Sequence, residues 1–238
     1  MTDGEGDHRE ATDAAAADGV AATQSFYSRW AQLYDALASH TPGIGGLRAR
    51  AADRLQLSTG DTVVEMGCGT GANFSYLRER VGPEGAVVGV DLTPGMLGPA
   101  RARINRAGWA NVHVVAGDAT RPPVTDADAV FASFVSGMLG EPATVVDDWA
   151  DLVGPGGRVG LLDLARSTST LGRPVNALFA GLVFAGLPSK RPADALAAPR
   201  TLDARVVAAQ RALRDRCRDV TYSTHALGFA RLAAGTVK

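Results

Sequence analysis

The residues with the clearest chemical potential form one short glycine-rich loop. The run Val63-Val-Glu-Met-Gly-Cys-Gly-Thr-Gly71 places an apolar strand directly before three closely spaced glycines, and a helix pattern follows. Glycine lets the backbone approach a ligand where side chains would collide. The first N–H groups of the following helix carry partial positive charge and have no partner inside the helix. We therefore predict that this loop, with Gly67, Cys68, Gly69 and Gly71, binds a ligand.

Three carboxylates around this loop indicate what the ligand is. Asp91 ends the next strand, 20 residues after Gly71, where a carboxylate can accept both hydroxyls of a ribose. Asp118 follows the third strand and can accept the amino group of an adenine. Glu65 immediately precedes the loop, where it suits an ammonium group and repels a pyrophosphate. Adenine, ribose and a cationic amino-acid tail without phosphate describe S-adenosylmethionine.

The glycine loop alone leaves a second interpretation open. Gly67-Cys-Gly-Thr-Gly-Ala72 also satisfies the relaxed GxGxxA pattern of dinucleotide-binding proteins. Glu65, Asp118 and the end of the chain favour the first interpretation. The last two predicted strands, 219–224 and 228–235, have no helix between them and must therefore be antiparallel, unlike an all-parallel dinucleotide-binding sheet.

The elements that must position these residues alternate between strand and helix. Strands are predicted at 62–66, 86–90, 111–116, 128–133 and 158–163. Such alternation predicts a parallel, doubly wound α/β sheet that is covered on both faces. Helices are predicted at 24–37 and 47–57 before the first strand, and at 72–80, at 94–107 with Thr93 as N-cap, and from Pro142 between strands. A further helix is predicted around Leu202–Leu213, after a Pro-rich loop containing Pro188, Pro192 and Pro199. Residues 1–22 form an acidic tail with almost nothing to bury, which we predict to be disordered.

Four motifs together resemble the class I S-adenosylmethionine-dependent methyltransferases. They are Val64-Glu-Met-Gly-Cys-Gly-Thr-Gly71, Val88-Gly-Val-Asp-Leu-Thr-Pro-Gly-Met-Leu97, Gly117-Asp-Ala119 and Leu152-Val-Gly-Pro-Gly-Gly-Arg158. Within that class the chain is most similar to the ubiquinone/menaquinone C-methyltransferases, because Tyr34-Asp35 and the closing strands also match. The resemblance covers roughly residues 25–165 and 219–238. It implies S-adenosyl-L-methionine as cofactor, and Leu92, Met96, Ala119 and Ser133 complete the predicted cofactor-binding set.

The resemblance also implies a fold. We expect a Rossmann-like sheet of seven strands, mostly parallel with an antiparallel C-terminal strand, preceded by N-terminal helices. Residues 23–238 would then form a single methyltransferase domain, and residues 166–200 would be a helical insertion that caps the substrate.

One departure from the quinone enzymes concerns the methyl acceptor. Those enzymes carry Phe-Gly-Leu-Arg-Asn after the fourth strand, whereas this chain has Phe134-Val-Ser-Gly-Met138, so that Gly137 and Met138 replace the Arg and Asn. The acceptor therefore need not be a quinone. Methylation of an amine, including a phospholipid head group, and a non-catalytic S-adenosylmethionine-binding module stay as alternatives. No catalytic residue is predicted, and the substrate-side candidates are Tyr27, Tyr34, Phe134 and Ser136.

The apolar run 175–187 is the main clue to the acceptor. It is too short to span a bilayer, and it is either a core helix of the cap or a surface that admits a lipid-like substrate at the membrane interface. No acidic residue occurs between Arg166 and Asp194, and no Trp or Tyr occurs there either, so this segment offers a cationic amine little. An apolar acceptor, quinone-like or lipid-like, fits better.

Composition excludes several other classes of protein. The chain of 238 residues has 24 basic and 25 acidic residues, which argues against nucleic-acid binding by charge. Neither Cys68 nor Cys217 forms a CxxC pair, and no pair among the four His and two Cys has metal-ligand spacing, so we predict no metal and a reducing compartment. The acidic N-terminus does not resemble a secretory signal. We expect a cytoplasmic enzyme, with peripheral membrane contact as an option and an oligomeric state that the sequence leaves open.

Overall fold

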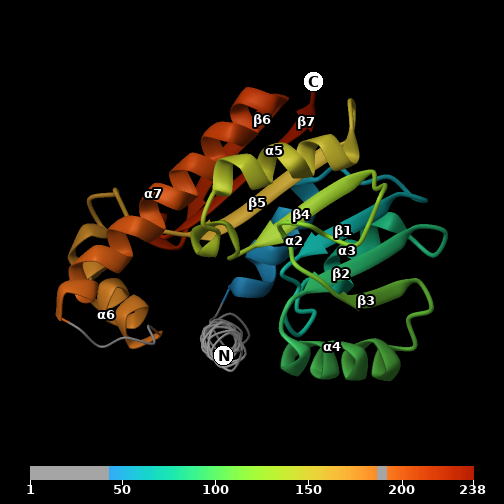
Figure 1. The fold of residues 1–238 in the computed structure, drawn as a ribbon, viewed down its shortest axis with the longest axis horizontal. Helices are drawn as coiled ribbons and strands as arrows, with labels where there is room; N and C mark the ends of the chain where they lie inside the picture. The colour runs from blue at the N-terminus through green and yellow to red at the C-terminus, as the bar shows by residue number, and fades with distance from the viewer. Residues whose placement is uncertain (1–42, 187–191) are drawn as a thin grey trace, which may run out of the picture.

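A seven-stranded sheet forms the centre of the protein (Figure 1). The structure is a computed structural model, and it describes residues 43–186 and 192–238. The strand order is β3-β2-β1-β4-β5-β7-β6. The strands are β1 (Thr62–Met66), β2 (Ala86–Asp91), β3 (Val112–Ala116), β4 (Ala129–Ser133), β5 (Arg158–Leu164), β6 (Cys217–His225) and β7 (Ala230–Val237).

The direction of the strands confirms the predicted fold class. β1 pairs in parallel with β2 and with β4, β2 pairs in parallel with β3, and β4 with β5. β7 is antiparallel to both of its neighbours, β5 and β6. The order reverses between β1 and β4, and ligands of open α/β sheets bind at the carboxyl ends of the strands beside such a reversal.

Helices cover both faces of the sheet. α2 (Ile44–Arg54), α3 (Phe74–Val81) and α4 (Pro94–Ala107) bury apolar side chains on one face. α5 (Pro142–Val153) and α7 (Pro192–Arg216) cover the other. Short 3-10 helices occur at η1 (Ser136–Met138), η2 (Arg173–Val175) and η3 (Ala226–Gly228).

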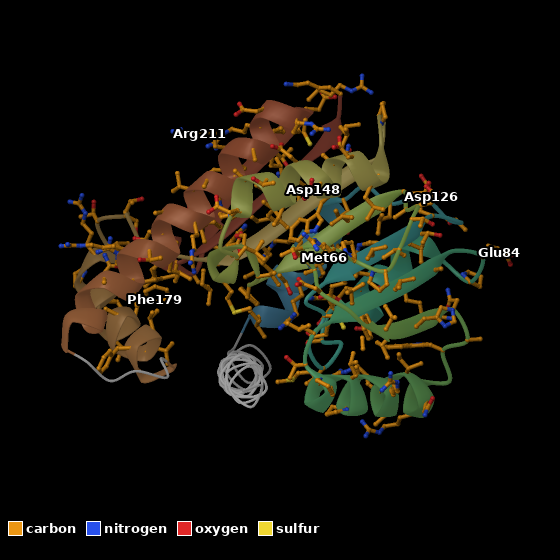
Figure 2. The ribbon with its side chains drawn as sticks, viewed as in Figure 1. Met66, Glu84, Asp126, Asp148, Phe179 and Arg211 are labelled. Atoms are coloured by element: carbon orange, nitrogen blue, oxygen red, sulfur yellow. The ribbon has the colours of Figure 1, made fainter. Side chains whose placement is uncertain are left out.

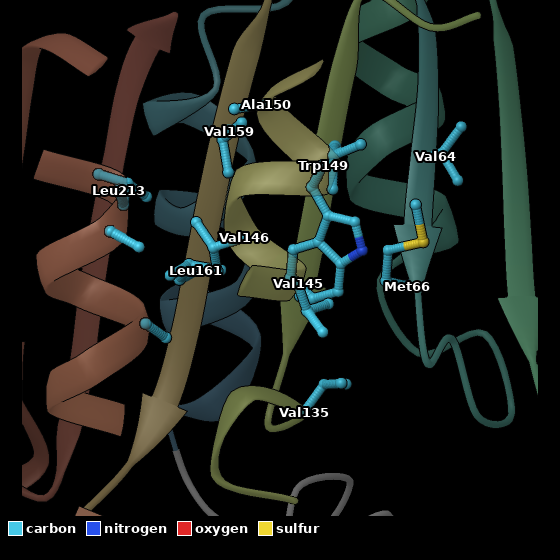
Figure 3. Close-up of a cluster of buried hydrophobic side chains, with 14 of the residues drawn as sticks. Val64, Met66, Val135, Val145, Val146, Trp149, Ala150, Val159, Leu161 and Leu213 are labelled. Atoms are coloured by element: carbon cyan, nitrogen blue, oxygen red, sulfur yellow. The ribbon is translucent and has the colours of Figure 1, made fainter. Parts of the chain in front are cut away.

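The part of the core that α5 and α7 cover extends to the carboxyl ends of β1 and β4. Trp149 on α5 is almost fully buried, and Figure 3 shows its indole between Met66 on β1 and Val145. Burying one large apolar side chain contributes about 1.5–3 kcal/mol. The indole Nε1 also donates a hydrogen bond to the carbonyl oxygen of Ala119 at 2.8 Å. This side chain therefore links the core to the loop that follows β3.

α6 (Asn176–Gly186) extends beyond the carboxyl end of β5 and contacts mainly the N-terminal half of α7 (Figure 1). Among the side chains of this helix that the structure describes, those of Phe179 and Val183 are buried, in a small separate cluster with Leu202 and Phe229. In Figure 2, Phe179 lies far to one side of Met66, the last residue of β1. None of the helices in the described ranges is long and apolar enough to cross a membrane.

The predicted Pro-rich loop is partly wrong. α7 begins at Pro192 and continues through Pro199 to Arg216, so two of the three prolines are helical. Proline is well accommodated in the first turn of a helix, because the N–H groups there have no partner inside the helix. Pro199 is buried and stands inside the helix, where its cost of roughly 3 kcal/mol has to be offset by packing. Pro188, the acidic tail and the predicted helix at 24–37 lie outside the described residues.

Candidate cofactor and acceptor site

A cavity of about 360 Å³ lies where β1, β2, β3 and β4 end. It combines the glycine loop, the ends of β2 and β3, one residue of α2 and the segment after β4. Its lining consists of Arg48, Gly67, Cys68, Gly69, Thr70, Ala72, Asn73, Asp91, Leu92, Thr93, Asp118, Ala119, Thr120, Ser133, Phe134, Val135, Met138, Leu139 and Gly140.

The glycine loop adopts a backbone that other residues resist. Gly67, Gly69 and Gly71 all have positive φ, between 55° and 75°. A Cβ added at Gly67 would lie 2.5 Å from Cγ2 of Val135, and one at Gly71 would collide with the Phe74 ring. Two of the three glycines are therefore required by packing as well as by conformation, and the loop stays open toward the cavity.

Asp91 joins the end of β2 to the glycine loop. One carboxylate oxygen accepts the N–H of Gly69 at 2.8 Å, and the other accepts the N–H of Thr93 at 2.8 Å. Burial raises the pKa of Asp91, whereas these backbone hydrogen bonds lower it. The Thr93 side chain also hydrogen-bonds this carboxylate, and because each carboxylate oxygen accepts about two hydrogen bonds, accepting capacity is still left for a ligand at the cavity wall. A carboxylate with such accepting capacity suits a pair of ribose hydroxyls, which would donate to its oxygens.

A buried polar network extends from α2 to β4 beneath the loop. Arg48 Nη1 donates to Asn73 Oδ1 at 2.6 Å, and Asn73 Nδ2 donates to Glu65 Oε1 and, at 2.8 Å, to Ser133 Oγ. Glu65 is fully buried, and its Oε2 has no hydrogen-bond partner among the described residues.

The protonation state of Glu65 is set by its burial and by its polar and charged neighbours. Burial raises the pKa of Glu65 to about 7, although Asn73 and the nearby Arg48 lower it. A cation bound nearby would favour the ionised form. Glu65 is a buried carboxylate with one oxygen unpartnered within the described ranges, and the neighbouring Arg48 reaches the cavity. When Glu65 is ionised, the two side chains offer a negative charge for a ligand's ammonium and a positive charge for its carboxylate.

The opposite wall follows β3. Asp118 is exposed, and its Oδ1 accepts the N–H of Thr120 at 2.8 Å, which shapes a tight turn. The adjacent Ala119 is held from behind by the Trp149 indole. The carboxylate of Asp118 therefore stands at the rim of the cavity, on a turn that is fixed to the core.

The segment after β4 makes the remaining wall apolar. Phe134 adopts a φ of 62°, a strained conformation for a non-glycine residue, and its N–H donates to the carbonyl oxygen of Leu162 at 2.6 Å. The Arg48 guanidinium lies 5.8 Å from the centre of the Phe134 ring. Val135, Met138 and Leu139 continue this wall, and Figure 3 shows Val135 beyond the end of β1.

The structure brings most of the predicted site residues together. Among the lining residues are Gly67, Cys68, Gly69, Asp91, Leu92, Asp118, Ala119, Ser133 and Phe134. Glu65, Gly71, Met96 and Ser136 do not belong to the lining: Glu65 lies behind Asn73, and Met96 and Ser136 are buried. Tyr27 and Tyr34 lie outside the described residues.

Five polar residues of the cavity lining were missed from the sequence: Arg48, Thr70, Asn73, Thr93 and Thr120. Arg48 belongs to α2, 19 residues before Gly67, and nothing in its local pattern distinguishes it from neighbouring arginines. Asn73 could have been found, because it lies two residues after Gly71 at the start of α3, where a polar side chain can turn back toward the loop.

The described residues give little support to metal binding or to a reactive cysteine. Among the described residues, no group of three or more His, Cys, Asp or Glu could hold a metal ion. Cys68 is buried, and burial raises the pKa of its thiol far above the ordinary value, which makes it a poor nucleophile.

Comparison with known proteins agrees with this geometry. Residues 63–157 match the family model described as a methyltransferase domain. The chain is 33% identical over 127 residues to an arsenite methyltransferase of Halobacterium salinarum, covering 52% of this chain and 32% of that protein. It is 29% identical over 123 residues to a demethylmenaquinone methyltransferase of Lactococcus lactis, covering 51% of this chain and 49% of that protein. The chain thus spans half or less of these curated relatives.

Solved structures extend the likeness to most of the chain. A SAM-dependent methyltransferase from Aquifex aeolicus superposes with a TM-score of 0.55 at 18% identity, covering 80% of this chain and 89% of that one. At this identity the superposition shows a common fold. Residues 63–157 thus match a methyltransferase domain, and the seven-stranded sheet that carries the glycine loop has the fold of class I S-adenosylmethionine-dependent methyltransferases. The predicted likeness to the menaquinone enzymes is confirmed, and it stands beside likeness to methyltransferases with other acceptors.

Proposed function

We propose that this chain transfers the methyl group of S-adenosylmethionine to a small apolar acceptor. The observation that carries the proposal is the division of one cavity into a polar half, built on β1 to β3, and an apolar half, built on the segment after β4. S-adenosylmethionine supplies an electrophilic methyl group on a sulfonium when it is bound. The acceptor supplies the electron pair, and the chain has to hold the two in line.

The polar half fits every part of the cofactor. Asp91 would accept the ribose hydroxyls, and Asp118 would accept the adenine amino group at the rim. Glu65, through its orphaned oxygen and Asn73, would hold the ammonium group, and Arg48 would face the carboxylate. The cradle of Gly67, Cys68 and Gly69 would let the tail pass close to the backbone. A nicotinamide dinucleotide fits less well, because its pyrophosphate would approach a buried carboxylate.

The apolar half supports catalysis by positioning. Its described side chains, Phe134, Val135, Met138 and Leu139, offer no base that could take a proton from the acceptor. They exclude water and leave orientation as the main contribution, which is worth about 7–11 kcal/mol of barrier in well-oriented reactions. An apolar molecule gains from such a lining, whereas a cationic amine would lose its hydration without a compensating charge.

α6 supports access from a lipid surface. Its segment Asn176–Gly186 contains no charged residue, and Leu178 is 74% exposed. Arg173 precedes the helix, and the sequence continues with Lys190 and Arg191, which suits an anionic membrane. We therefore propose that α6 makes peripheral contact with a membrane from which the apolar acceptor enters, on the cytoplasmic side that the sequence analysis predicts for this protein.

The test of acceptor class is a transfer assay with methyl-labelled S-adenosylmethionine. A cell extract is divided into organic and aqueous fractions, and each is incubated with the purified chain. We expect label in the organic fraction. Label confined to the aqueous fraction would overturn the apolar acceptor, and label in neither fraction despite tight cofactor binding would favour a non-catalytic binding module.

The test of membrane contact is co-sedimentation with anionic phospholipid vesicles. Leu178→Asp should abolish sedimentation with the vesicles, because it places a charge on the apolar outer face of α6. Val207→Asp on α7 is the matched control, since Val207 is also an exposed apolar side chain but lies outside α6. Equal binding by the two variants would contradict the assignment of α6.

A further inference from the structure

Two buried polar side chains lie next to each other behind the apolar wall of the cavity. Asp163 is on β5 and is 2% exposed, and Ser136 begins η1 and is fully buried. The Ser136 hydroxyl and backbone lie close enough to lower the pKa of Asp163, although burial raises it to about 6. Within the described part of the chain, Asp163 Oδ2 and Ser136 Oγ have no hydrogen-bond partner besides each other.

Asp163 and Ser136 are not accounted for by a role in the hydrophobic core. Burying a carboxylate and a hydroxyl without good hydrogen bonds costs free energy, and replacing both by apolar groups of the same shape can be neutral. Arg231 faces Asp163 across the antiparallel pair of β5 and β7, which supplies part of the opposite charge. Arg231 itself donates to the carbonyl oxygen of Arg166 at 3.2 Å.

The segment beside this pair is the acceptor wall. Residues 134–140 leave β4 through the strained Phe134, whose N–H is held by Leu162, the neighbour of Asp163 on β5. Ser136 then starts the 3-10 turn, and Met138, two residues later, lines the cavity. Gly137 packs against Leu202 of α7, so the turn has little room to move toward that helix. β5 thus contacts the wall at two successive residues.

We propose that Asp163 is a positioning residue that acts through Ser136: it fixes residues 134–140 in the shape that receives the methyl acceptor. The inference rests on the proposed function, because it assigns that wall to the acceptor. It makes Asp163 important for transfer but not for cofactor affinity. The groups proposed to bind the cofactor lie on the glycine loop, at the ends of β1 to β4 and on α2, whereas the groups that the structure places against Asp163 are Ser136 and Arg231.

The experiment compares Asp163→Asn, Ser136→Ala and the double variant with the unaltered chain. Three readouts are measured: amide hydrogen exchange of residues 134–140 by mass spectrometry, affinity for S-adenosylhomocysteine by calorimetry, and label transfer to the organic extract. Asp203→Asn is the matched control, because it removes a carboxylate that pairs with Arg166 near the cap but leaves Asp163 intact.

We expect Asp163→Asn to speed exchange in 134–140 at least tenfold and to lower label transfer at least tenfold, with S-adenosylhomocysteine affinity within twofold. Ser136→Ala should act in the same direction, and the double variant should be no worse than Asp163→Asn, because the two residues act as one unit. Asp203→Asn should leave exchange in 134–140 unchanged. If Asp163→Asn fails to fold, Ser136→Ala, which removes one oxygen, supplies the same three readouts.

Other outcomes would overturn the proposal. Unchanged exchange and transfer, an equal loss of S-adenosylhomocysteine affinity, or additive effects in the double variant would each contradict an action of Asp163 through Ser136. If the unaltered chain transfers no label to the organic extract, the proposed acceptor class fails. The exchange and calorimetry results still decide, in that case, whether Asp163 fixes the wall independently of the cofactor.

Discussion

The two halves of the cavity recognise their ligands by different physical means. The half on β1 to β3 presents backbone N–H groups and carboxylates whose positions are fixed by short hydrogen bonds, such as Gly69 and Thr93 to Asp91. The half after β4 presents apolar side chains on a single segment that leaves the sheet at Phe134. Directional bonds select one molecule, whereas an apolar wall selects by volume and shape.

This difference separates what is common to methyltransferases from what is particular to this chain. On the proposed function, the polar half binds the cofactor, and its groups are numerous and held by hydrogen bonds. The apolar half would match one acceptor, and few groups define it. Substitutions in the polar half should therefore lower cofactor affinity, whereas those in the apolar half should leave cofactor affinity unchanged and lower transfer.

The largest effect on cofactor affinity is expected for Asp91→Ala. The change removes a charged acceptor from two hydroxyls, and each such hydrogen bond is worth ~1.5–3 kcal/mol. It also leaves the N–H groups of Gly69 and Thr93 without their carboxylate. Calorimetry should show at least a tenfold loss of S-adenosylhomocysteine affinity while circular dichroism shows the fold intact. Near-normal affinity would mean that the ribose lies elsewhere.

A smaller effect is expected from the ionisation of Glu65. Its pKa is raised from 4.5 to about 7, so the protonated form is favoured in the folded state. The stability that protonation contributes is full below about pH 4.5 and is lost as the pH rises through about 7. Cofactor binding should change in the opposite sense, because only the ionised carboxylate attracts an ammonium group.

The measurement for Glu65 is S-adenosylhomocysteine affinity from about pH 6 to about pH 7.2, below the α-amino pKa of about 7.7. Affinity should rise roughly fivefold over this range, which is less than the limit of tenfold per pH unit for one proton. Glu65→Gln removes the titrating group, keeps the shape of the side chain and should flatten the profile. The same rise in the variant would assign the pH dependence to another group.

Asp118→Ala should have a still smaller effect. Its carboxylate is exposed, so water replaces much of what the adenine amino group loses, and one such bond is worth ~0.5–1.5 kcal/mol. We expect S-adenosylhomocysteine affinity to fall about threefold. A loss as large as that of Asp91→Ala would show that the rim becomes closed when the cofactor binds.

Met138→Ala should have the smallest effect on the cofactor. This side chain belongs to the apolar half, and its removal enlarges the space for the acceptor without touching the glycine loop. S-adenosylhomocysteine affinity should stay within twofold, while label transfer to the organic extract should fall several-fold. A marked loss of cofactor affinity would remove the distinction between the two halves.

The fold was largely predictable because its pattern is local. Apolar runs, turn residues and the helix start at Thr93 and Pro94 lie within a few residues of one another, and α4 begins at Pro94 as predicted. The antiparallel end followed from the absence of a helix between the last two strands. The prolines of α7 misled the prediction, because tertiary packing around Pro199 outweighs its unfavourable local preference.

The site was predictable only where function is tied to a motif. Asp91 and the glycines have fixed offsets within consecutive strands and loops, so the sequence pattern identifies them. Arg48 reaches the cavity from α2, and Asp163 on β5 lies beside Ser136 in η1; both arrangements arise only when the sheet assembles. Glu65 was predicted at the ligand; it is buried next to the cavity lining, where Asn73 Nδ2 donates to its Oε1, and its contact with the cofactor stays a prediction.

The central claim is that this cavity binds S-adenosylmethionine, and titration calorimetry tests it directly. The purified chain is titrated in turn with S-adenosylmethionine and with NADH, and the Asp91→Ala variant is the control. We predict saturable binding of S-adenosylmethionine that weakens at least tenfold in Asp91→Ala, and no binding of NADH. Binding of NADH without binding of S-adenosylmethionine would contradict the account.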